Sequence, residues 1–255
     1  MADLADWTLA LKNLLLPQFC RQCGARLLTE ENNFFCPTCW EMSPAIERPF
    51  CTGCGRPHPP TVGFGTRSNF PCAACRERPN RYLRRVYGAM RYDGAVEEAI
   101  KLFKFNGRER LAGPLGALLT DFAERELECD RYDALVPVPL HKVRQRARGY
   151  NQSEVLAREA LAAFPAARLD TSLARIRPTR TQSKLQGKAR QSNVRGAFAV
   201  EGDSLSGAHV LLVDDVVTSG GTITECGRAL TRAGAASVDV LAVALATPPD
   251  VALDD

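Results

Sequence analysis

Apolar positions follow two patterns from about residue 82 onward. Short continuous apolar runs predict buried strands, and segments with apolar residues three or four positions apart predict amphipathic helices. We expect strands at 86–92, 134–140, 198–200, 210–213 and 238–245. We expect helices around 96–103, 111–122, 154–163 and 222–233. Strands that alternate with helices are typical of a parallel sheet with both faces covered, so the pattern predicts an α/β domain.

The first 80 residues do not show this alternation. Trp7, Leu11 and Leu14 fall at helical spacing and predict a short N-terminal helix with one buried stripe. Charged residues interrupt that stretch, which argues against a signal peptide, and no apolar run approaches the ~20 residues of a membrane span. We therefore expect a cytoplasmic protein of two parts, a small module at 1–80 and a larger domain at 81–255.

Cysteine spacing indicates how the small module folds. Eight of the ten cysteines form four Cys-x-x-Cys pairs within the first 75 residues. Two such pairs supply four thiolates, which is the ligand set of a closed, structural zinc site. The module needs such a metal because it has few large apolar residues and cannot bury enough surface to fold alone. The predicted ligands of two structural zinc ions are Cys20, Cys23, Cys36, Cys39, Cys51, Cys54, Cys72 and Cys75.

The sequence leaves the pairing of these cysteines open. In a sequential arrangement the first four hold one ion and the last four hold the other, whereas in a crossed arrangement the first and third pairs share an ion. A disulfide framework, typical of secreted proteins, and a redox Cys-x-x-Cys motif are the competing interpretations. The fourfold repetition of one spacing favours zinc, because a redox motif occurs once.

Charge is distributed unevenly along the 255 residues. The formal net charge is only +4, and a composition that is 45% hydrophobic and 24% charged excludes a disordered or fibrous chain. Residues 131–200 contain 14 basic and 4 acidic residues, whereas 201–255 contain 2 basic and 9 acidic ones. A basic segment followed by an acidic one predicts an anion site beside a carboxylate site.

The segment 210–222 carries the most specific chemistry. An apolar strand leads into Asp214 and Asp215, then into a loop rich in hydroxyl groups and glycine, then into a helix. Glycine lets backbone N–H groups approach an anion and a helix start favours negative charge, so the loop is predicted to bind phosphate. The two carboxylates would repel phosphate and suit hydroxyl groups or Mg²⁺. The predicted phosphate-binding residues are Thr218, Ser219, Gly220, Gly221 and Thr222.

A ligand with a phosphate at one end, a diol in the middle and a metal-bound diphosphate would fit this layout. The segment resembles the signature of type I phosphoribosyltransferases, which bind 5-phosphoribosyl 1-diphosphate (PRPP). The stretches VPVPLH at 136–141 and RxRGYNQ at 146–152, with the pattern over 177–198, resemble the ComF family of competence-associated phosphoribosyltransferase-like proteins. In that family a cysteine-pair zinc module precedes the transferase domain. The resemblance thus implies a type I phosphoribosyltransferase-like parallel sheet preceded by a small zinc-ribbon module.

The same resemblance implies that the loop after the strand ending near Leu140 holds the diphosphate, and that the stretch from about 175 to 195 closes over it. Basic residues support a polyanion independently, because 173–195 contains seven basic residues and no acidic one. This polyanion is diphosphate or the backbone of single-stranded DNA. Thin aromatic content, with Tyr150 alone available for stacking, disfavours DNA. The remaining predicted substrate-binding residues are Leu140, His141, Arg146, Arg148, Lys184 and Arg190.

Three functions follow from these predictions. The first is an enzyme that uses PRPP and magnesium to transfer phosphoribosyl to an unidentified acceptor. The second, implied by the ComF resemblance, is an accessory protein for single-stranded DNA import or handling in natural competence, with DNA or competence proteins as partners. The third is a sensor that binds PRPP without turnover. The sequence separates them poorly, because a fold does not fix a function, and it assigns no catalytic base.

Overall fold

The computed structural model describes residues 14, 17–27, 34–59, 68–104, 109–177 and 194–246. Most of the predicted N-terminal helix lies outside these ranges. Leu14, which is within them, is helical but 70% exposed, so its side chain does not belong to a buried stripe. Among the helices of the described ranges, none is long and apolar enough to cross a bilayer.

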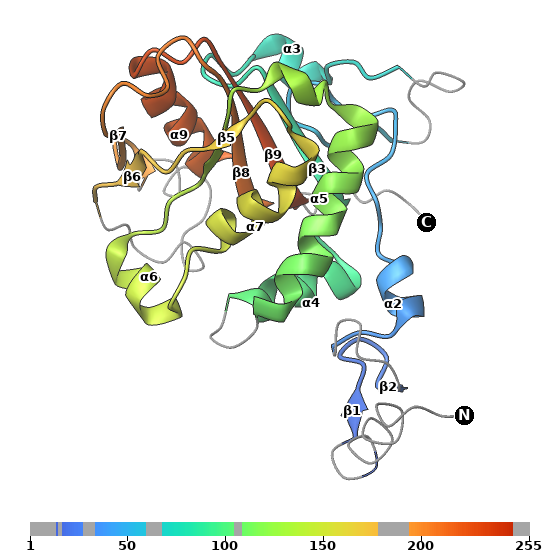
Figure 1. The fold of residues 1–255 in the computed structure, drawn as a ribbon. Helices are drawn as coiled ribbons and strands as arrows, with labels where there is room; N and C mark the ends of the chain where they lie inside the picture. Colours follow the sequence, from blue (N-terminus) through green and yellow to red (C-terminus); the bar gives the residue numbers. More distant parts are fainter. Residues whose placement is uncertain are drawn as a thin grey trace.

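A parallel sheet of five strands forms the centre of the larger domain (Figure 1), which confirms the predicted fold class. The apolar run 210–213 lies in the middle strand with no exposed surface, as its continuous hydrophobicity predicts. All neighbouring strands pair in parallel. The strand order across the sheet is β3 (Arg85–Arg91), β9 (Ser237–Leu245), β8 (His209–Val217), β4 (Ala134–Pro137) and β5 (Arg168–Leu169).

Helices cover both faces of this sheet. In Figure 1, α5 (Ala112–Glu126) and α7 (Gln152–Ala160) lie on one side, and α9 (Gly221–Arg232) lies on the other. Each helix buries its apolar stripe against the strands, as helical spacing predicts. The remaining helical elements of this domain are α4 (Gly94–Phe103), α6 (Lys142–Arg148), η1 (Glu109–Leu111), η2 (Cys129–Arg131) and η3 (Leu161–Ala163).

Two elements differ from the sequence-based prediction. The strand expected over 134–140 ends at Pro137, because prolines at 137 and 139 cannot donate ladder hydrogen bonds. The basic residues that follow form the helix α6, whose end is set by Gly149 in the left-handed conformation at φ 84°. Two short strands, β6 (Leu173–Arg175) and β7 (Phe198–Val200), pair antiparallel and hold together the two ends of the segment between them.

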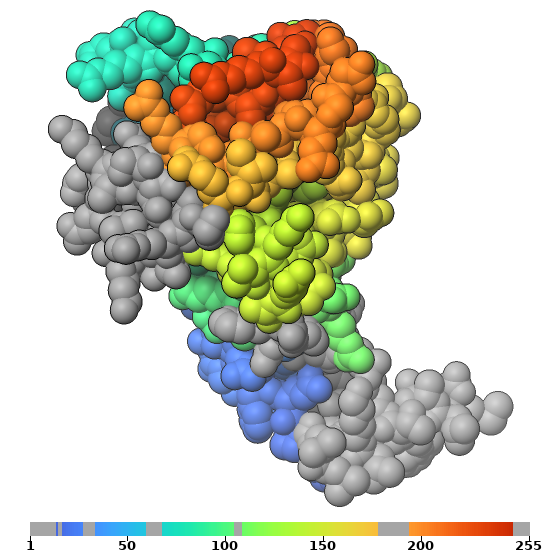
Figure 2. Space-filling view, turned by 90° about the vertical axis from the view of Figure 1, so that its left-hand side faces the viewer, coloured from blue at the N-terminus to red at the C-terminus, as the bar shows by residue number. Residues whose placement is uncertain are grey.

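The zinc-ribbon module contains two knuckles of similar design. The first knuckle (residues 20–39) includes the hairpin of β1 (Gln18–Phe19) and β2 (Arg26–Leu27), whose connection contains Cys20 and Cys23, and the second knuckle spans residues 51–75. In each, the third cysteine caps a short helix that contains the fourth, namely α2 (Pro37–Glu41) and α3 (Ala73–Glu77). Figure 2 shows the first knuckle (blue) projecting away from the bulk of the domain.

The second knuckle is instead joined to the α/β core. Phe50, which precedes its first cysteine, is 1% exposed and packs against Tyr87 and Phe122 with ring centroids 6.4 and 6.1 Å apart. The chain just before it lies along the edge of β3, where the Ile46 N–H donates to the Ala89 carbonyl at 2.9 Å. This contact also covers the edge strand, whose unpaired backbone groups would otherwise be open to another chain.

Alanine substitution of one glycine in each knuckle tests how closely that knuckle packs against its surroundings. Gly24 and Gly55 both have left-handed backbone, with φ of +73° and +74°. A Cβ at position 24 meets nothing within 4 Å, whereas one at position 55 lies 2.5 Å from the Val86 carbonyl oxygen. Gly24→Ala should therefore cost about 1–2 kcal/mol of local strain. Gly55→Ala should cost more than ~3 kcal/mol, because it adds a backbone clash, as measured by urea unfolding of the zinc-loaded protein. Equal losses for the two variants would show that the second knuckle does not depend on contact with β3.

Candidate active site and zinc centres

The two predicted halves of the phosphate site follow adjacent strands. β4 and β8 pair with Pro137 opposite Val213, and the Val138 N–H donates to the Val213 carbonyl at 2.9 Å. Because both strands end at the same edge, the loop that contains Leu140 and His141 lies beside the segment that begins at Asp214. The sheet thus places the start of the loop assigned to the diphosphate beside Asp214, and the loop assigned to the 5-phosphate begins after Val217, at the end of the same strand β8.

The loop between β8 and α9 has the conformation that an anion site requires. Thr218 and Ser219 are exposed, and Gly220 caps α9 with left-handed backbone at φ +76°. No side chain caps the first turn of α9, so its N–H groups are available to an external acceptor. Gly221 and Thr222 begin the helix and are partly exposed.

Asp214 accepts two hydrogen bonds. The Ser153 hydroxyl donates to its Oδ1 at 3.0 Å, and the backbone N–H of Asp215 donates to the same oxygen at 2.9 Å. Burial of the carboxyl group, together with the neighbouring charge of Asp215, raises the pKa of Asp214 to about 7. Asp214 can therefore change its charge near neutral pH.

Asp215 is 8% exposed and faces a lysine. The Lys104 Nζ, at the end of α4, lies 3.3 Å from its Oδ2. Sequence reasoning missed Lys104 and Ser153, because neither belongs to the quoted phosphate-loop segment. Ser153 directly follows the RxRGYNQ stretch, which was the available signal, whereas no sequence signal connects Lys104 to Asp215.

The basic residues after β4 do not form one surface. On the helix α6, Arg144 and Arg148 are four positions apart and partly buried, whereas Lys142 and Arg146 are exposed. Arg148 donates to the Gln152 side chain at 2.9 Å, and burial lowers its pKa while the charge of Asp215 opposes this. The structure does not bring Arg146 to the other site residues, because it has no hydrogen bond or ion pair within the described chain.

His141 starts α6 and accepts the Val143 N–H with its Nδ1 at 3.4 Å. Beside it, a cavity of about 230 Å³ is lined in part by Leu140, Lys142 and Arg175. The Arg175 guanidinium lies 5.4 Å from the centre of the Phe198 ring, across the β6–β7 pair. The predicted site residues Lys184 and Arg190 lie outside the described residues.

The cysteines form two tetrads in sequential order, Cys20, Cys23, Cys36 and Cys39, and Cys51, Cys54, Cys72 and Cys75. In each tetrad all sulfurs lie within 4.8 Å of one another, and the Sγ atoms of Cys23 and Cys36 are 3.7 Å apart. Zinc with four sulfurs at ~2.3 Å places them ~3.8 Å apart, so the tetrads fit zinc ribbons that bind zinc. The crossed arrangement does not occur.

Hydrogen bonds favour a thiolate in the second tetrad. Cys51 accepts backbone N–H groups from Gly53 and Cys54 at 3.4 Å and from Cys72 at 3.2 Å. The side chain of Cys54, followed by these backbone donors, lowers the pKa of Cys51 to about 4, although burial opposes the shift. The thiolate is the form that binds metal.

Comparison with known proteins identifies both parts of the chain. Residues 11–76 match the double zinc ribbon domain and residues 151–252 match the phosphoribosyl transferase domain. DNA utilization protein YhgH of Escherichia coli O6:H1 is 33% identical over 209 residues, which cover 80% of this chain and 87% of that protein. Competence protein ComFC of Bacillus subtilis is 27% identical over 222 residues, which cover 84% of each chain.

The chain belongs to the YhgH/ComF family. It combines a phosphoribosyltransferase-like domain with a double zinc ribbon, as the sequence resemblance implies. Among solved structures, glutamine PRPP amidotransferase from B. subtilis, complexed with ADP and GMP, matches with a TM-score of 0.40 and 17% identity. That match covers 57% of this chain and 30% of the amidotransferase, a level of similarity that supports no functional argument.

Zinc content and release test the two tetrads. We expect two zinc ions per chain, one of which a chelator removes much faster. The fast site should be the first knuckle, because its Cys23 is exposed, whereas every cysteine of the second tetrad is at least partly buried and that knuckle adjoins buried Phe50. Absorbance of 4-(2-pyridylazo)resorcinol follows the release, and Cys129→Ser, outside both tetrads, should keep two ions. A single release rate, or fewer than two ions, would contradict this assignment.

The raised pKa of Asp214 makes a prediction about stability. Folding favours the protonated carboxyl, so stability falls as pH rises from the ordinary value near ~4 through about 7. Asp214→Asn removes this charge and retains an oxygen acceptor. The variant should therefore exceed the parent in melting temperature by about 3 °C at pH 8, with a smaller gain at pH 5. Asp121→Asn, at an exposed position on α5, is the control and should show no such gain at either pH.

Proposed function

We propose that this protein binds PRPP with magnesium at the carboxyl edge of its sheet and transfers the phosphoribosyl group to an acceptor. The observation that carries the proposal is that the loop of Leu140 and His141 leaves β4 beside Asp214, in the strand that leads into the Thr218–Thr222 loop. The loop before α9 would bind the 5-phosphate, and the two carboxylates would bind the ribose hydroxyls. The loop that contains Leu140 and His141 would bind the diphosphate.

The carboxylates fit a magnesium-dependent ligand. Lys104 compensates the charge of Asp215 at 3.3 Å, and Asp214 is partly neutralised through its raised pKa. Two adjacent acidic groups that are held in this way can accept hydroxyl donors or a divalent cation. Magnesium would supply neutralisation of the departing diphosphate charge. In the reaction, the bond between ribose C1 and the diphosphate oxygen breaks, and a bond from C1 to the acceptor nucleophile forms.

A second candidate is a role in handling single-stranded DNA. Relatives named for DNA utilization and competence favour it, as does the basic stretch over 173–195. Such a role would use phosphate contacts that weaken with salt. We also propose that the protein acts in the cytoplasm and that residues 1–80 and 81–255 are its two functional parts.

One titration series separates the two candidates. Asp214→Asn with Asp215→Asn should weaken PRPP binding by several kcal/mol, because each aspartate is expected to hold contacts of about 1.5–3 kcal/mol. Binding of single-stranded DNA should not weaken in this variant. Asp121→Asn with Glu124→Gln, two exposed positions on α5, is the matched control and should leave PRPP binding unchanged.

The reverse variant replaces Lys184, Lys188 and Arg190 with Ala, and should lower DNA affinity and flatten its salt dependence. Diphosphate release with magnesium, screened against bases, amines and DNA, reports turnover. Equal loss of DNA binding in the double aspartate variant would show one shared site and contradict the separate roles.

A further inference from the structure

A second pocket lies between the second knuckle and α9. Its volume is about 600 Å³, within the range of small-molecule sites. The knuckle, the connection to β3 and the loop of Thr218 to Gly220 line it, so it borders the phosphate loop from the side of the zinc ribbon. Neither aspartate of the candidate active site belongs to its lining.

Arginine dominates the polar lining. Five arginines and no acidic residue line the pocket, and four of these arginines come from the ten residues 76–85. Arg84 pairs with buried Asp239, and Arg85 donates to the Tyr87 hydroxyl at 3.2 Å. The other three, Arg56, Arg76 and Arg78, have no ion pair with any carboxylate of the described chain.

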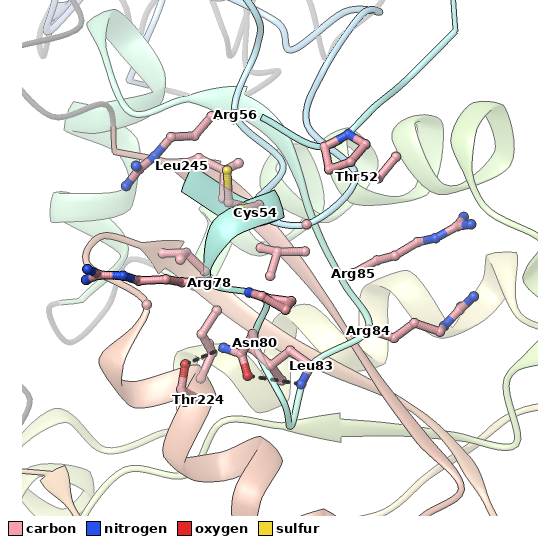
Figure 3. Close-up of a pocket in the computed structure, with 18 of the residues that line it drawn as sticks. Thr52, Cys54, Arg56, Arg78, Asn80, Leu83, Arg84, Arg85, Thr224 and Leu245 are labelled. Carbon is pink, nitrogen blue, oxygen red and sulfur yellow. Dashed lines mark hydrogen bonds between the residues drawn. The ribbon is translucent and has the colours of Figure 1, made fainter. Parts of the chain in front are cut away.

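The geometry separates these two groups. Figure 3 shows the guanidinium groups of Arg56 and Arg78 on one side of the pocket, with Arg84 and Arg85 extending to the other. Arg56 donates to the Thr218 carbonyl at 3.3 Å, which ties the knuckle to the phosphate loop. Arg76 and Arg78 are exposed, and their N–H donors are open to a ligand.

The zinc centre does not account for all of this charge. A zinc ion with four thiolates carries two negative charges, and Cys54 and Cys75 of this tetrad line the pocket. Three unpaired guanidinium groups exceed those two charges, and the N-terminal end of α9 adds partial positive charge. The pocket therefore retains an attraction for anions.

The rest of the lining includes an apolar wall. Leu83, Val86, Ile223 and Leu245 line it, each no more than 6% exposed. Asn80 connects the segment before β3 to α9, since its amide donates to the Thr224 hydroxyl at 2.9 Å and its oxygen accepts the Leu83 N–H at 3.2 Å (Figure 3). An arginine side beside an apolar wall suits a ligand with phosphates at one end and a flat, weakly polar ring at the other.

We propose that this pocket binds a nucleoside di- or triphosphate, with its phosphates at Arg56, Arg76 and Arg78 and its base on the apolar wall. The site shares the loop of Thr218 to Gly220 with the proposed PRPP site but contains neither Asp214 nor Asp215, and it does not depend on the proposed transfer reaction. It gives the second knuckle a ligand-binding role in addition to its structural one.

ATP is the probe, titrated calorimetrically into the zinc-loaded full chain without magnesium. Arg76→Gln with Arg78→Gln should weaken ATP binding about 100-fold, because two charge-assisted contacts are lost. Arg81→Gln is the matched control, since Arg81 lies in the same segment, is exposed and does not line the pocket. It should bind ATP as the parent does. Asp214→Asn with Asp215→Asn should also retain ATP binding, which separates this test from that of PRPP.

Three results would overturn the proposal. The first is no ATP binding by the parent protein at millimolar concentration, or equal binding by the Arg76→Gln and Arg78→Gln double variant. The second is loss of zinc from that variant at unchanged ATP affinity, which would show that the arginines only balance the thiolate charge. The third is binding of a 20-nucleotide oligo(dT) that depends on Arg76 and Arg78 and that ATP does not displace, which would assign the surface to DNA.

Discussion

The parallel pairing of β4 with β8 is the constraint on which the candidate active site depends. Because Pro137 lies opposite Val213, the chain leaves β4 beside Asp214, while β8 continues to Val217 along β9. A shift of one residue would reverse the faces of the strand and move Asp214 and Asp215 away from their partners. The strand β8 is also paired with β9 on its other side, where Val213 lies opposite Leu241, so two neighbouring strands hold this register.

The carboxylate pair illustrates how the fold tolerates charge at a buried position. Two adjacent acidic groups at the end of a central strand would repel each other, and burial would increase the cost. The two carboxylates are stabilised by different partners. Asp215 receives Lys104 from α4, whereas Asp214 receives hydroxyl and amide donors and a raised pKa. The fold therefore holds both carboxylates without leaving two uncompensated charges side by side.

The second knuckle of the zinc ribbon packs directly against the α/β core. Phe50 enters the aromatic cluster of Tyr87 and Phe122, and Gly55 approaches the backbone of β3 so closely that no side chain fits. These contacts fix the second knuckle against the sheet and bring Arg56 to the Thr218 carbonyl. The first knuckle also reaches the domain, because α2 contacts α4 and its Leu27 and Phe35 belong to the buried apolar cluster.

The sequence by itself determined the features that depend on neighbouring residues. Apolar runs located the central strands, the Cys-x-x-Cys spacing located the two cysteine tetrads, and the order of strand, aspartates, glycine loop and helix predicted a phosphate site. Only the tertiary structure decided the sequential tetrads, the partners of Asp214 and Asp215, and the helical faces that separate Arg146 from Arg148. Those depend on contacts between residues far apart in the chain, such as Lys104 with Asp215, and local spacing contains no record of them.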